Sequence, residues 1–157
     1  MSYRATRNIE ASFIEAIQTL MNADWSGVSV EKSFSRVYNI ALPVICVRVG
    51  STVHNKVEVG SDATMREPQV FIDIFGSDEG NKLDLKDYLV EKLKSGIVYN
   101  TYVIHNGTVQ TRTASGRIRV LKIDDVPVSF DTEKDKLDVH DRYRTLITLT
   151  VSLGKVE

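Results

Sequence analysis

Apolar and polar residues recur along the chain with two different periods, and these periods predict its secondary structure. Between residues 4 and 22, apolar side chains return every three or four positions, which is the spacing of one face of an α-helix. A second helix is predicted after Ser77 or Asp78, because either residue is a suitable N-cap, and it ends before Gly96. Both helices have only one apolar face, so each is expected to pack on a sheet.

Strict alternation of apolar and polar residues predicts the strands. The longest alternating run covers residues 143–153, whereas residues 69–75 are apolar on both faces and should form a central strand that is covered on each side. The pairs Asn106-Gly107 and Ser115-Gly116 are both typical of turns between strands. The predicted strands are residues 28–38, 44–49 with 56–59 as its hairpin partner, 69–75, 97–105, 108–113, 117–128 and 143–153, and residues 131–141 are predicted to be a charged loop.

The resulting order is a helix, the strands up to residue 75, a second helix and four further strands, with hairpin connections between most strands. This order predicts an α+β fold, with a largely antiparallel or mixed β-sheet and two α-helices packed on one face. A length of 157 residues fits a single domain over residues 1–157, and 42% hydrophobic residues is ordinary usage for a globular protein. The chain shows no internal repeat, low-complexity tract or domain linker.

Charge and cysteine content narrow the expected setting. Twenty Lys and Arg residues against twenty-one Asp and Glu residues give a net charge of −1, which does not favour binding to DNA or to an anionic membrane. The single cysteine, Cys46, lies in an apolar strand and is interpreted as a core residue. No signal peptide or membrane span is predicted, so we expect a soluble protein that is assembled in a reducing cytoplasm.

The sequence contains none of the common catalytic or ligand-binding motifs. It has no nucleophile elbow and no glycine-rich phosphate loop. The three histidines, His54, His105 and His140, are far apart in polar segments and are interpreted as surface residues. Residues 76–80 are acidic and are interpreted as a helix cap, and residues 131–142 lack the glycine and the final glutamate of a calcium-binding loop. We therefore expect no enzymatic activity, no cofactor and no metal.

One basic cluster is present, between residues 112 and 122. A turn at Ser115-Gly116 would bring its side chains together across two strands, where they would meet phosphates or an acidic neighbour. Because stacking aromatic residues are absent nearby, we favour a protein interface or a solvated strand. Two carboxylates of the second helix face either a basic partner or solvent. The candidate interface residues are Arg112, Arg117, Arg119, Lys122, Asp84 and Asp87.

Several segments resemble, in order and pattern, the tail-terminator or tail-completion proteins of long-tailed bacteriophages. The segments are residues 42–47, 56–61, 71–75, 78–89 and 142–151. The resemblance implies an α+β virion protein without enzymatic activity, which forms a ring, usually a homohexamer, at the head-proximal end of the tail. Such a ring stops tail-tube polymerisation and joins the tail to the neck or connector. The implied partners are further copies of the chain, the tail-tube protein, the sheath protein and neck or connector proteins, while DNA passes through the ring.

A closed ring requires that one patch of a subunit binds a different patch of its neighbour. Hairpins and open strand edges supply such patches, so the predicted hairpins at residues 97–113 and 117–130 are candidates for contacts between subunits or with the tube. Two alternatives remain open at this stage. The protein is a different neck or head-completion connector, or it is a small nucleic-acid-binding module that acts through Arg112, Arg117 and Arg119.

Overall fold

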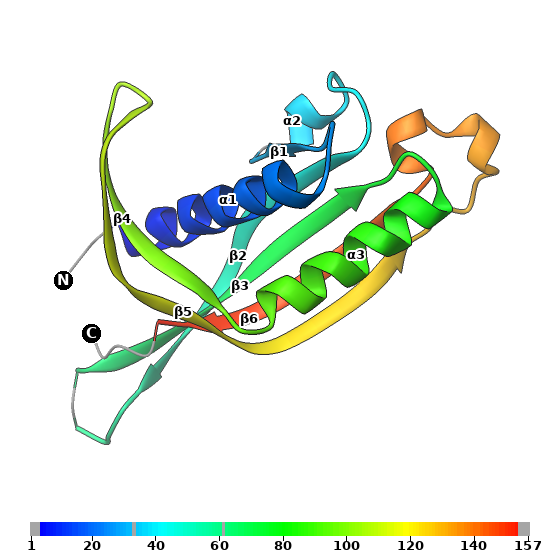
Figure 1. The fold of residues 1–157 in the computed structure, drawn as a ribbon. Helices are drawn as coiled ribbons and strands as arrows, with labels where there is room; N and C mark the ends of the chain where they lie inside the picture. Colours follow the sequence, from blue (N-terminus) through cyan, green and yellow to red (C-terminus); the bar gives the residue numbers. More distant parts are fainter. Residues whose placement is uncertain (1–3, 33, 61, 154–157) are drawn as a thin grey trace.

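The computed structural model describes residues 4–32, 34–60 and 62–153 of the chain. Helices and strands alternate irregularly along it (Figure 1). The elements are α1 (Ala5–Asp24), β1 (Ser29–Glu31), α2 (Phe34–Val37), β2 (Val44–Lys56), β3 (Thr64–Phe75), α3 (Glu79–Leu93), β4 (Ile97–His105), β5 (Thr108–Val128), the 3-10 turns Lys134–Lys136 and Val139–Asp141, and β6 (Arg144–Ser152).

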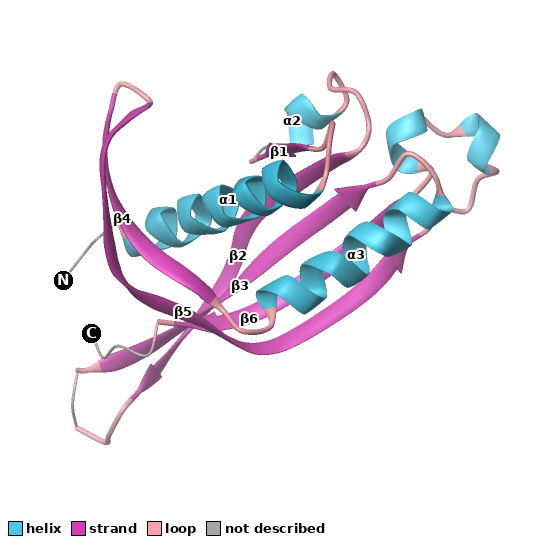
Figure 2. Cartoon of the chain, viewed as in Figure 1, coloured by secondary structure: helices cyan, strands magenta, loops and turns pink. Residues whose placement is uncertain are grey.

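In the described part of the chain, the strands form one six-stranded sheet in the order β1-β2-β3-β6-β5-β4. β1 runs parallel to β2, and the other neighbouring pairs are antiparallel. The two long helices, α1 and α3, lie in front of the same face of this sheet (Figure 2). The fold is therefore α+β with a mixed sheet and two helices on one face, as the sequence predicts.

The core lies between this sheet face and the two helices. Strand register places Ile45 opposite Ile74, and Ile72 opposite Ile147, so one face of three adjacent strands is apolar. Phe13 of α1 packs in the same buried cluster. Burying large aliphatic and aromatic side chains in this way is the main force that holds the helices on the sheet.

The opposite sheet face is covered at one end by α2. The small cluster there includes Val37, Val44, Cys46 and Phe75, all fully buried. β3 is third in the sheet order and has buried side chains on both faces, which agrees with the central strand that the sequence predicts.

The predicted start of the second helix is also confirmed. The carboxylate of Asp78 accepts a hydrogen bond from the Asn81 amide at 2.7 Å, and the Ser77 amide donates to the Asn81 side chain at 3.1 Å. These bonds satisfy amide groups that a helix N-terminus leaves unpaired. After the helix, Gly96 has a φ of +85°, a backbone conformation that glycine adopts without strain.

Two strand predictions in the first half of the chain are wrong. Of residues 28–38, only Ser29–Glu31 form a strand, because Phe34 and Val37 lie one helical turn apart and both pack in the α2 cluster. Residues 56–59 are not a hairpin partner of residues 44–49. Instead β2 continues to Lys56 and pairs with β3, with a change of register between Val49 and Thr52.

The second half of the chain also departs from prediction. The hairpin turn at Asn106-Gly107 is present, with positive φ at both residues, but Ser115-Gly116 is not a turn. Ser115 is an extra residue inside the ladder, because Gly116 pairs with Tyr99 and Ala114 pairs with Asn100. β5 is therefore one continuous strand of 21 residues, and residues 117–130 are not a hairpin.

The charged segment 131–141 is partly ordered into the two 3-10 turns. His140, predicted to be a surface residue, is buried, and its ring binds the Ile40 carbonyl at 2.7 Å and the Asp138 carboxylate at 2.9 Å. His54 and His105 are exposed, as predicted.

Cys46 allows a direct test of the core. Its side chain is 0% exposed, and burial raises the pKa of its thiol from 9.0 to about 11. Because the thiolate is the nucleophile that attacks thiol reagents, we expect no labelling of the native protein at pH 8 and one labelled thiol per chain in urea. The raised pKa also means that this group's contribution to stability is lost as the pH rises through about 11.

The matched control for this measurement is Val59→Cys, since Val59 is fully exposed. The variant should react once per chain without denaturant. Fast labelling of the wild-type protein under the same conditions would contradict the burial of Cys46.

Candidate functional site

The four basic candidates do not form one cluster. Arg112 makes an ion pair with Glu15 of α1. Arg117 donates hydrogen bonds to the carbonyl oxygens of Ser95 and Gly96, at 3.0 and 3.3 Å. The expectation that a turn at Ser115-Gly116 would gather these side chains is wrong, because β5 does not reverse there. Both arginines instead fix the position of β5 relative to its neighbours.

The remaining candidates lie farther along the chain. Arg119 and Lys122 pair with Ser152 and Thr150, which are two residues apart on β6. They therefore share the sheet face opposite α1 and α3. Lys122 lies 3.3 Å from the Asp124 carboxylate, and both Arg119 and Lys122 are exposed.

Asp84 and Asp87 are exposed on α3. Asp87 lies 3.3 Å from the ammonium group of Lys86, which also lies 3.7 Å from Asp125 of β5. Exposed ion pairs of this kind contribute little to stability, so both aspartates remain candidates for contact with a partner.

α1 closes part of the outer edge of β4, the last strand of the sheet. The Asn100 amide donates to the Ser12 hydroxyl at 3.1 Å, and the Tyr102 amide donates to the Asn8 side chain at 3.4 Å. Asn8 and Ser12 are buried among the apolar residues of α1. Their polar side chains within that apolar stripe are the sequence signal for this contact, which our sequence analysis missed. With these amides satisfied, this part of the edge is not open for pairing with another strand.

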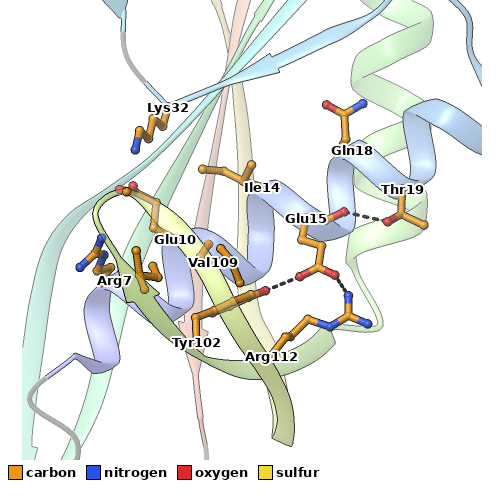
Figure 3. A pocket seen from close by; sticks show the side chains of 13 residues that line it. Arg7, Glu10, Ile14, Glu15, Gln18, Thr19, Lys32, Tyr102, Val109 and Arg112 are labelled. Carbon is orange, nitrogen blue, oxygen red and sulfur yellow. Dashed lines mark hydrogen bonds and ion pairs between the residues drawn. The ribbon is translucent and has the colours of Figure 1, made fainter.

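A groove of about 680 Å³ lies between α1 and the hairpin formed by β4 and β5 (Figure 3). Ile14, Ile104 and Val109 contribute apolar lining. The carboxylate of Glu15 accepts a hydrogen bond from the Tyr102 hydroxyl and also binds Arg112, which ties the hairpin to the helix. The other charged lining residues are Arg7, Glu10 and Lys32.

β2 and β3 extend beyond the rest of the sheet as a two-stranded ribbon, which we call the β2–β3 arm (residues 52–60 and 62–68). β1 pairs with β2 only as far as Cys46, and β6 pairs with β3 only from Gln69 onward. Among the described residues, the two strands of the arm pair only with each other, and Figure 1 shows the arm projecting from the body. Val53, Val57 and Val59 are exposed on it.

A buried charge network lies on the sheet face opposite the long helices. The Asp73 carboxylate lies 3.2 Å from the Arg48 guanidinium and 3.6 Å from that of Arg144, which also binds Asp141 at 3.2 Å. The Arg144 guanidinium is 4.6 Å from the centre of the Phe75 ring. Burial raises the pKa of Asp73, while both arginines act in the opposite direction. Because the network connects β2, β3 and β6, we assign it a role in holding the fold together.

A scan against protein-family models and a search of curated proteins both find no match for this chain. No helix among the described residues is long and apolar enough to cross a membrane. Within residues 4–32, 34–60 and 62–153, no three His, Cys, Asp or Glu side chains are grouped so that they could hold a metal ion.

Proposed function

We propose that this protein is a structural subunit that assembles into a ring and serves as the tail terminator of a long-tailed bacteriophage. In this role the ring occupies the head-proximal end of the tail, stops polymerisation of the tail tube and joins the tail to the neck or connector. The resemblance of residues 42–47, 56–61, 71–75, 78–89 and 142–151 to that group supports the proposal.

The structural observation that carries the proposal is the β2–β3 arm. No other strand among the described residues pairs with either long edge of the arm, and three valines on it are exposed. Unpaired edges and exposed apolar side chains favour association with other chains. The arm therefore supports a protein that functions by binding other protein chains.

The arm and the groove beside α1 are different patches of one subunit. A contact between different patches is heterologous, and repeating it generates a closed ring when the rotation between subunits allows closure. A two-fold dimer would instead exchange the arm and the groove reciprocally between two chains, so the mass of the oligomer distinguishes a dimer from a ring. The expected stoichiometry is six, and the expected location is the tail or neck region of the virion.

The alternative of a nucleic-acid-binding module has less support. Arg112 and Arg117 are engaged within the chain, by Glu15 and by two backbone carbonyls. A net charge of −1 also suits a ring through which DNA passes without being held. The alternative of another neck or connector protein is separated from the terminator by experiment.

The proposal predicts a stable oligomer about six times the mass of the 17.6 kDa chain in sedimentation velocity, or assembly on addition of purified tail tubes. In electron micrographs, phage particles that lack the protein should carry abnormally long tails. Unjoined tails of normal length would instead identify a connector. A chain that stays monomeric with and without tubes contradicts the ring.

A further inference from the structure

The proposed ring leaves open which surfaces of neighbouring subunits meet. We infer that the tip of the β2–β3 arm (residues 56–60) of one subunit binds in the groove between α1 and the β4–β5 hairpin of the next subunit. This inference rests on the proposed function, because it assumes that the partner is a second copy of this chain. We call the tip of the arm the donor surface and the groove the acceptor surface.

The acceptor surface combines an apolar lining with excess positive charge. Ile14, Ile104 and Val109 line the groove, and its volume of about 680 Å³ is sufficient for several side chains. Glu15 and Arg112 neutralise each other. The remaining charged lining residues are Arg7, Lys32 and Glu10, and in the described part of the chain neither Arg7 nor Lys32 has an ion-pair partner. One uncompensated positive charge is left.

The donor surface has the complementary character. Val59 is fully exposed at the end of the arm, and Val57 is about half exposed. Between them lies Glu58, an exposed carboxylate with no ion-pair partner among the described residues, whereas Lys56 is paired with Asp62 at 3.8 Å. Two valines that flank an unpaired carboxylate match an apolar groove whose lining carries a net positive charge.

The placement of the two surfaces favours contact between chains. The arm and the β4–β5 hairpin project in different directions from one subunit, so the tip lies away from its own groove (Figure 1). Asn8 and Ser12 satisfy the outer backbone amides of β4 at Tyr102 and Asn100. The contact is therefore made by side chains of the tip that enter the groove, and not by addition of a strand to this part of β4.

Cysteine cross-linking between two variants tests the contact directly. Val59→Cys and Val109→Cys are made separately, each at an exposed position, and the purified variants are mixed and oxidised. We expect a disulfide-linked dimer that contains one chain of each variant, and no linked dimer from either variant alone. The native Cys46 is buried and does not interfere.

The matched control replaces Val109→Cys with Leu121→Cys, which is equally exposed and lies twelve residues farther along β5. This mixture should give no linked dimer above background. Equal cross-linking by both mixtures overturns the inference, since it would report random collision. Absence of a mixed disulfide in a mixture that sediments as the oligomer also overturns it.

Charge reversal tests the electrostatic match independently. Glu58→Lys and Lys32→Glu should each weaken subunit association by about tenfold, a typical effect for one well-placed charge pair, and the double variant should recover most of that loss. Lys94→Glu, an exposed substitution at the end of α3, should leave association unchanged. If the two single variants lose affinity and the double variant loses the sum of both, with no recovery, Glu58 and Lys32 do not pair between subunits.

Sedimentation of the unmodified protein separates failure of this inference from failure of the proposed ring. A protein that is monomeric at every concentration and with tail tubes contradicts the ring and this contact together. A protein that forms the ring, yet gives neither the mixed disulfide nor the charge-reversal effect, leaves the ring intact and overturns only the contact proposed for the arm and the groove.

Discussion

Replacing Arg144 by Met is expected to reduce the free energy of unfolding by about 3 kcal/mol at pH 7, because it removes one of the two guanidinium groups that compensate the buried Asp73 carboxylate and leaves only Arg48 beside it. The side chain of Arg144 is only 13% exposed, and it is shared by Asp73 and Asp141. Methionine fills part of the space against Phe75 but cannot neutralise Asp73. Urea unfolding followed by circular dichroism measures the loss.

The loss should depend on pH in a defined direction. Burial already holds the pKa of Asp73 above its ordinary value of 3.8, and removing one opposing guanidinium raises it further. A carboxyl group with a raised folded-state pKa contributes stability that is fully present below the ordinary pKa and is lost as the pH rises through the folded-state pKa. The deficit of the variant should therefore be smaller near pH 4 than at pH 7.

Arg119→Met is the matched control, since Arg119 is exposed on the same sheet face. Its effect should stay within about 0.5 kcal/mol, as for most surface substitutions. If both variants lose the same stability, or if the Arg144 deficit grows toward acid pH, the network around Asp73 does not stabilise the fold as described.

Replacing Gly96 by Ala is expected to cost about 3 kcal/mol, the combined effect of positive φ in an L-residue and of overpacking. A Cβ atom at Gly96 would lie 2.3 Å from the carbonyl oxygen of Ile118, and the φ of Gly96 is +85°. The atom in the way belongs to the backbone of β5, so the strand itself must move. Thermal and urea unfolding measure the effect.

Gly27→Ala separates the two contributions. Gly27 has a φ of +72°, but a Cβ there would meet nothing within 4 Å. The Gly27→Ala variant should therefore lose only the free energy of unfolding that comes from placing an L-residue at positive φ, about 1–2 kcal/mol. Equal losses in the two variants would show that the close approach of Gly96 to Ile118 carries no cost.

Elements with a buried face were predictable from the sequence. The helix after Asp78 and the strand that ends at Ser152 both have regular apolar spacing, because one side of each faces the core. Periodicity reports burial, so it fails where an element has solvent on both sides. The outer half of β2 includes Ser51, His54 and Asn55, which resemble a loop in sequence although they belong to a strand.

The same reasoning explains the missed continuity of β5. Ser115-Gly116 resembles a turn, yet Tyr99 across the ladder pairs with Gly116, and the extra residue is absorbed as a bulge. The groove was not predictable either, because it depends on Glu15 meeting Tyr102 and Arg112, which are 87 or more positions away in the sequence. Contacts of such sequence separation are set by topology and have no local signal.

The undivided length of β5 has a mechanical consequence. Its first half pairs with β4 and its second half with β6, so one run of backbone joins the projecting hairpin to the centre of the sheet. A pull along the hairpin would load the β5–β6 hydrogen bonds side by side in shear, and many of them would have to break together. A force applied to the hairpin is therefore transmitted to the centre of the sheet through this single strand.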